Sequence, residues 1–184
     1  MARLTLNYPN IQDELGQLHS IYDENEYLTF GVWLYLVPQY KPDSVLMLGY
    51  GGGTAAKYIR KFYGNVPITA VDFSDVSEFL IDGVEWVNQD AKDYVKTAPK
   101  FDAVIVDCYD TNDMHPPDFV LSQEFADDLG KIANYIVLHT TRDDDTSAYD
   151  QYYKVRELTT NSGGEFEPHF HYYMVNEVAR LPVR

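Results

Sequence analysis

The sequence predicts a three-layer α/β sandwich whose sheet is mainly parallel and has an antiparallel edge near the carboxyl-terminal end. Short apolar runs, typical of strands buried on both faces, alternate with stretches of helical periodicity, and this alternation indicates βαβ units. The segment from His169 to Leu181 alternates weakly between apolar and polar residues, which suits closing antiparallel strands. The length of 184 residues, with no internal repeat or linker, fits a single domain over residues 1–184.

Five apolar runs are expected to form the parallel strands, and helical segments should follow the first, third and fourth. Ser122 is a good cap for the helix after the fourth run. Only eleven residues separate Asp72 from Val84, so the connection there should hold a shortened helix. The five runs are Ser44–Leu48, Ile68–Val71, Val84–Val87, Ala103–Val106 and Tyr135–Leu138.

The two ends of the chain differ from this pattern. Ile11, Leu15 and Leu18 fall at helical spacing, and residues 27–36 form an apolar segment long enough for a second helix. Residues 1–43 are therefore predicted to be an amino-terminal helical segment. Residues 149–158 also have a helical pattern.

Composition restricts the partners. The formal net charge of −15 disfavours nucleic acid, because binding it requires Lys and Arg against phosphates. A negative field concentrates small cationic ligands, although an acidic surface also serves solubility alone. Cys108 is the single cysteine, no signal peptide is recognisable, and the longest apolar stretch is too short for a bilayer. We therefore expect a cytoplasmic protein that contacts no membrane.

A glycine-rich loop follows the first expected strand and precedes a helix. Glycine has no Cβ, so Gly49-Tyr50-Gly51-Gly52-Gly53 lets the backbone approach a ligand closely. No Lys-Ser/Thr pair follows the glycines, which excludes a Walker A phosphate loop. A tight turn without any ligand would need the same residues, so both interpretations stay open.

Acidic residues follow the next two strands, and ligands of parallel sheets bind outside the carboxyl ends of strands. Asp72 lies about 20 residues past the glycine loop, where a carboxylate can accept hydrogen bonds from ribose hydroxyls. Phe73 could pack on an adenine face. Asp90 could accept from an adenine amino group or cap the following helix, and the sequence does not separate these roles.

Asp107-Cys108-Tyr109-Asp110 is the densest group of functional side chains. One carboxylate could take a proton from an amine nucleophile while the other holds a cationic tail, or the acids could simply belong to a polar turn. No basic neighbour is visible that would lower the pKa of Cys108, so a buried apolar role is expected for it.

The spacing of the histidines predicts neither a metal site nor a catalytic triad. His169 and His171 would share one face of a strand, but no cysteine or carboxylate at ligand spacing completes a metal site, so no metal is predicted. His19, His115 and His139 are scattered, and no histidine-based triad can be assembled.

The order of these motifs resembles that of spermidine synthase-like proteins, the polyamine aminopropyltransferases, which belong to the S-adenosylmethionine-dependent transferases with a Rossmann-like sheet. Tyr27-Leu28-Thr29-Phe30 also looks like the segment before the first strand in that family. The resemblance covers residues 20–140 and is carried by Val45–Thr54, Ala70–Asp72, Gln89–Ala91 and Phe101–Asp110.

The resemblance implies an enzyme that moves an aminopropyl group from decarboxylated S-adenosylmethionine to a polyamine. It implies that Asp107 deprotonates the attacking amine and that Asp110 binds the polyamine. The implied substrate contacts also include Tyr109 and Tyr27. The implied contacts to the adenosyl donor are Gly49, Tyr50, Gly51, Gly52, Gly53, Asp72, Phe73, Gln89 and Asp90.

Three departures from the family keep alternatives open, and the shortened connection between Asp72 and Val84 is one of them. Gly52 stands where polyamine synthases carry an aspartate that holds the donor's amine, and the family's amino-terminal β-domain is expected to be absent. A methyltransferase that uses S-adenosylmethionine on a small molecule or protein is one alternative, and a non-catalytic binding module of the same fold is another. The expected partner is a small molecule, which is an amine where the reaction is aminopropyl transfer. A homodimer is left open.

Overall fold

The structure is a computed structural model of the chain. It describes residues 4–8, 10–14, 16, 18–21, 31–109, 115–160 and 167–175. Every statement below on structure concerns these residues. Tyr27 and Asp110, two of the residues expected to bind substrate, lie outside them.

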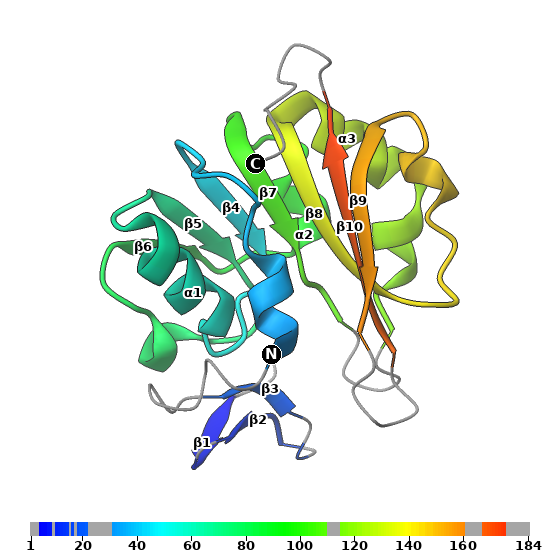
Figure 1. The fold of residues 1–184 in the computed structure, drawn as a ribbon. Coiled ribbons are helices and arrows are strands. Elements are labelled where there is room, and N and C mark those ends of the chain that lie inside the picture. The colour runs from blue at the N-terminus through cyan, green and yellow to red at the C-terminus, as the bar shows by residue number, and fades with distance from the viewer. Residues whose placement is uncertain are drawn as a thin grey trace.

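A seven-stranded sheet forms the centre of the molecule, with the order β6-β5-β4-β7-β8-β10-β9 (Figure 1). The pairs from β6 to β8 are all parallel, and β10 is antiparallel to both of its neighbours, β8 and β9. The predicted parallel sheet with an antiparallel edge is confirmed. The strands are β4 (Val45–Leu48), β5 (Ile68–Val71), β6 (Val84–Val87), β7 (Phe101–Val106), β8 (Ala133–Thr141), β9 (Tyr153–Thr159) and β10 (Pro168–Met174).

Helices cover both faces of this sheet, as the continuous apolar runs require. Alternate residues of β4 enter two different clusters: Val45 and Met47 pack with α1 (Thr54–Tyr63), η1 (Gly31–Leu36) and η2 (Ser77–Phe79). Leu46 and Leu48 pack on the opposite face with α2 (Ala91–Tyr94), α3 (Gln123–Ile132), η3 (Asp118–Leu121) and η4 (Ser147–Tyr149). The short η2 confirms the expected shortened crossover after Asp72. None of the helices in the described part of the chain has the length and apolar content needed to cross a membrane.

The amino-terminal segment is not the predicted helix. Its residues form a separate three-stranded antiparallel sheet of β1 (Thr5–Asn7), β2 (Asn10–Gln12) and β3 (Leu18–Ile21). Gly16 has a φ of 81°, a conformation that ends any helix through this point. Ile11 is fully buried against the glycine loop, whereas Leu18 is 43% exposed, so the helical spacing does not correspond to one buried face. Within the predicted second helix, the described residues form the 3-10 helix η1.

The predicted helix over residues 149–158 is also wrong. The chain forms η4 and then β9, which pairs with β10 from Tyr153 opposite Met174 to Thr159 opposite His169. Backbone hydrogen bonds to a neighbouring strand outweigh the local helical pattern here, because β propensity depends strongly on tertiary context. The predicted antiparallel strand from His169 is confirmed as far as Met174.

Gly49 and Gly53 both have positive φ angles and shape the turn from β4 into α1. At Gly49, an added Cβ would lie 2.2 Å from the backbone oxygen of Asp107. The turn after β4 therefore lies directly against the end of β7, and a side chain at Gly49 would separate them.

We predict that Gly49→Ala destabilises the protein more than Gly64→Ala does. Both glycines have positive φ angles, which cost another residue about 1–3 kcal/mol, but a Cβ at Gly64 would meet nothing within 4 Å. The steric conflict with Asp107 should add about 1–3 kcal/mol to the loss of unfolding free energy in Gly49→Ala. Urea unfolding of the two variants measures the difference, and equal losses would contradict the close contact.

Candidate functional site

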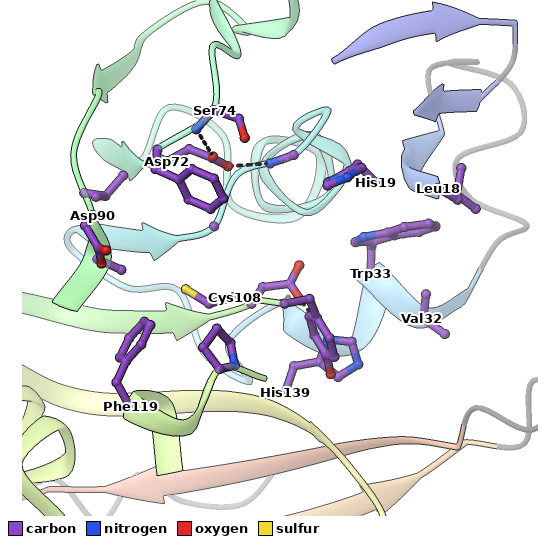
Figure 2. Close-up of a pocket in the computed structure, with 18 of the residues that line it drawn as sticks. Leu18, His19, Val32, Trp33, Asp72, Ser74, Asp90, Cys108, Phe119 and His139 are labelled. Atoms are coloured by element: carbon purple, nitrogen blue, oxygen red, sulfur yellow. Dashed lines mark hydrogen bonds and ion pairs between the residues drawn. The ribbon is translucent and has the colours of Figure 1, made fainter. Parts of the chain in front are cut away.

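A cavity of about 470 Å³ lies where the parallel strands end. Its walls come from the ends of β4 to β8, from the amino-terminal sheet and from η1 (Figure 2). Figure 2 shows Asp90 and Phe119 at one end of the cavity and Val32 and Trp33 at the other. Loops after parallel strands leave such a crevice where the strand order reverses, here between β4 and β7.

Asp72 follows β5 and holds the glycine loop in place. Its Oδ2 accepts hydrogen bonds from the backbone N–H groups of Tyr50 at 2.8 Å and Gly51 at 3.1 Å. Its Oδ1 accepts from the Ser74 N–H at 2.8 Å (Figure 2). Each carboxylate oxygen has two lone pairs, so Oδ1 retains the capacity to accept from a hydroxyl in the cavity that Asp72 lines. The sequence predicted a ligand contact for Asp72 and missed this bracing role.

Asp90 lines the cavity and also caps a helix. Its Oδ1 accepts a hydrogen bond from the Lys92 N–H at 2.8 Å at the start of α2. Both interpretations that the sequence left open are therefore compatible with one side chain. Phe73 lines the cavity and is half-exposed, whereas Gln89 is exposed and is not part of the cavity wall.

The glycine loop divides its residues between the cavity and the core. Gly49 and Gly51 line the cavity. Tyr50 is buried instead: its hydroxyl donates to the Phe79 carbonyl at 3.1 Å and accepts from the Ile81 N–H at 3.2 Å. Tyr50 is therefore a structural residue and not a wall of the cavity.

The amino-terminal sheet packs on the remaining part of the loop. A Cβ at Gly52 would lie 2.2 Å from Ile11 Cδ1 and 2.6 Å from Ser20 Cβ, and a Cβ at Gly53 would meet the Tyr50 ring. Neither Gly52 nor Gly53 lines the cavity. In the same sheet, His19 lines the cavity and its Nε2 lies 3.2 Å from a carboxylate oxygen of the buried Asp13.

Asp107 has a partner that the sequence did not reveal. Its Oδ1 lies 2.7 Å from Nδ1 of His139, and both side chains line the cavity. The His139 ring is fixed by Phe170, which stacks on it at 4.4 Å with an interplanar angle of 10°, and the Tyr109 ring lies 4.7 Å away. A carboxylate that orients an imidazole can accept a proton from a bound ligand.

The signal for this pair was present in sequence but incomplete. Asp107 follows β7 and His139 lies near the end of β8, so both are at carboxyl ends of strands. Only the sheet order, which makes β7 and β8 neighbours, brings the two side chains together.

A second group of ligating side chains lies away from the cavity. Glu157, His169 and His171 offer three ligand atoms within 4.8 Å of one another. The expectation that no carboxylate completes the histidine pair is wrong, because β9 was predicted as a helix and its register with β10 was unknown.

Comparisons with known proteins identify the fold. No protein-family model matches the chain, and no curated protein does. The human methyltransferase-like protein 13 in complex with SAH is 16% identical over 85% of this chain and 84% of its own, with a TM-score of 0.62. The chain has a Rossmann-like methyltransferase fold.

Spermidine synthases are among the similar structures. The enzyme from Thermotoga maritima is 15% identical over 95% of this chain and 73% of its own, with a TM-score of 0.57. A probable spermidine synthase from Corynebacterium glutamicum is 14% identical over 73% of this chain and 56% of its own, with a TM-score of 0.58. Identities this low establish the fold alone, so an activity has to be argued from the residues of the site.

Cys108 lies among the three carboxylates of the cavity. Burial raises the pKa of its thiol well above the usual value, and the nearby carboxylates of Asp72, Asp107 and Asp90 add to the shift. A protonated thiol is a poor nucleophile. The expectation that Cys108 is not the nucleophile agrees with this environment.

We predict that the native protein resists alkylation at Cys108. At pH 8, reaction with iodoacetamide should be more than about tenfold slower than in the urea-unfolded chain, since each unit of pKa lowers the thiolate fraction about tenfold. Cys108 is the only cysteine, so mass spectrometry of the intact chain reads the reaction directly. Equal rates in the folded and unfolded chain would contradict the assigned environment.

Proposed function

We propose that this chain is a transferase that uses an adenosyl sulfonium donor, and that it moves an aminopropyl group from decarboxylated S-adenosylmethionine to a polyamine. The observation that carries the proposal is the convergence of Asp72, Asp90 and Asp107, from three different strands, on one cavity. No Lys or Arg is among the described residues that line it. Such a cavity favours cationic ligands.

The charge of the cavity favours the decarboxylated donor over S-adenosylmethionine. Both donors carry a sulfonium cation, but S-adenosylmethionine also carries a carboxylate. Two histidines that line the cavity, His19 and His139, could bind that carboxylate, but each already lies beside an aspartate. The decarboxylated donor has no carboxylate to accommodate, and its aminopropyl chain ends in a second cation.

The donor's adenosine fits the Asp90 end of the cavity. Phe73, Ala91 and Phe119 supply apolar surface for the adenine ring, and Asp90 supplies an acceptor for its amino group. Asp72 Oδ1 accepts a ribose hydroxyl. This orientation directs the sulfonium toward Asp107 and leaves the end with Val32 and Trp33 for the acceptor amine.

Asp107 accepts the proton that the reaction releases. The acceptor ammonium first loses a proton to Asp107, which frees the nitrogen lone pair. The lone pair then bonds to the methylene carbon next to sulfur, and the C–S bond breaks with its electron pair moving to sulfur. Methylthioadenosine and a secondary ammonium are the products. Amines of this kind have a pKa of about 10.4, so a base beside the reacting nitrogen is required at neutral pH. His139 holds the Asp107 carboxylate in position.

Methyl transfer is the second candidate, and the contact at Gly52 favours it. Polyamine synthases carry an aspartate there for the donor's amine, whereas Ile11 and Ser20 fill that space in this chain. A methyltransferase does not need that carboxylate. In that case the acceptor is a small molecule or protein and the donor is S-adenosylmethionine. A cytoplasmic location and the roles of Asp110 and Tyr27 stay predictions.

We predict that calorimetry ranks the decarboxylated donor at least about tenfold tighter than S-adenosylmethionine, because no free cation for the carboxylate lies among the described residues that line the cavity. Methylthioadenosine should also bind. Asp72→Asn should weaken all three, while Asp82→Asn, which removes an exposed charge away from the cavity, should leave them unchanged. Tighter binding of S-adenosylmethionine would favour methyl transfer, and failure of all three to bind would overturn the proposal.

We predict that Asp107→Asn lowers turnover about 10²–10⁴-fold, the range for loss of a general base, while donor binding survives. His139→Gln should lower turnover less, since it removes only the group that orients Asp107. Mass spectrometry of the products distinguishes gain of an aminopropyl group from gain of a methyl group. Unchanged turnover in Asp107→Asn, with Asp82→Asn as the control, would remove Asp107 from the mechanism. A wild-type protein that binds donor and yields no product would favour a binding module.

A further inference from the structure

We propose that Glu157, His169 and His171 form a binding site for a zinc ion at the antiparallel edge of the sheet. Three ligand atoms, one from each residue, lie within 4.8 Å of one another. Two imidazoles and one carboxylate, with a position left for water, form a known class of zinc site. The proposal is independent of the transferase chemistry at the cavity.

The sheet register builds this site. His169 and His171 are two residues apart on β10, so their side chains share one face, and their rings stack at 4.4 Å. Glu157 on β9 lies directly opposite His171, and directly opposed side chains of antiparallel strands are neighbours. Phe170, between the two histidines, points to the other face and stacks on His139.

Both histidines place a buried ring nitrogen at this group. His171 Nδ1 makes no hydrogen bond with any described residue, and His169 Nε2 has the Glu157 carboxylate as its neighbour at 2.8 Å. Buried polar atoms without partners are uncommon, and each needs an explanation. A zinc ion would accept both lone pairs.

A neighbouring hydroxyl orients one of the rings. Thr140 Oγ1 lies 3.1 Å from Nε2 of His171. When this oxygen accepts the Nε2–H, the lone pair remains on Nδ1, on the side left without a partner. Zinc-bound histidines regularly donate their other N–H in this way.

Glu157 provides the charge and the route of entry. Its Oε1 lies 2.8 Å from His169 Nε2, and its Oε2 lies 3.1 Å from Lys154 Nζ. The histidines are buried and the Glu157 side chain is exposed. The exposed Glu157 side chain is therefore the side from which a metal ion reaches the two buried histidines.

Zinc titration of the full chain without a histidine tag tests the proposal. Calorimetry should give one zinc per chain. Glu157→Gln and His169→Gln should each weaken binding more than about 100-fold, and Thr140→Val about 10–100-fold, the usual cost of losing a group that orients a ligand. Lys154→Met alters the same strand without removing a ligand, so it should bind at least as tightly as the wild-type chain.

Folding of each variant is checked by circular dichroism and by its melting temperature without metal. Glu157 is exposed, so Glu157→Gln is expected to fold normally. This variant keeps the test decisive even if replacing a buried histidine prevents folding. Cobalt, used as a spectroscopic probe, should give the visible absorption of a four-coordinate site in the wild-type chain. Absence of zinc binding, or stoichiometric binding that Glu157→Gln leaves intact, would overturn the proposal.

Discussion

The carboxylate of Asp72 fixes the arrangement on which the cavity depends. By accepting the N–H groups of Tyr50, Gly51 and Ser74, it holds the glycine loop to the end of β5 and sets the position of the loop backbone. A loop held in this way needs no side chain of its own at Gly49 or Gly51. The cavity wall there is bare backbone, which a nucleoside can approach closely.

The cavity concentrates negative charge in a chain that is already acidic. A carboxylate in such surroundings is stabilised by hydrogen bonds and by partners, and each acid here has one: the loop amides for Asp72, the start of α2 for Asp90, and His139 for Asp107. These partners hold the acids in place at the cavity. In the proposed function, this charge would draw a cationic donor and a cationic acceptor to the same cavity.

The strand β10 connects two chemically different parts of the molecule. On one face, Phe170 stacks on His139 beside the cavity, while on the other face His169 and His171 approach Glu157. The alternation of side chains along a strand produces this division. A metal at the edge and a ligand in the cavity would each restrain the same strand from opposite sides.

Much of the fold was readable because its signals are local. Apolar runs such as Val45–Leu48 identify buried parallel strands, glycines mark the turn after the first of them, and acids after successive strands predict where a ligand binds. The predictions failed where a segment's structure depends on what it packs against. Ile11 is buried by the glycine loop and not by a helical neighbour, and β9 is a strand because β10 lies beside it.

The sequence by itself determined the parallel α/β sheet, the glycine loop and the positions of Asp72, Asp90 and Asp107 at strand ends, because these follow from hydrophobic periodicity and chain order. The tertiary structure alone decided which distant residues meet. His139 reaches Asp107 through the adjacency of β7 and β8, and Glu157 reaches His171 through the register of β9 and β10. Strand order arises from contacts between residues far apart in the chain, so the local apolar pattern that identifies each strand does not say which strands become neighbours. The register of β9 with β10 has a meaning only once that segment is a strand, which its neighbour decides.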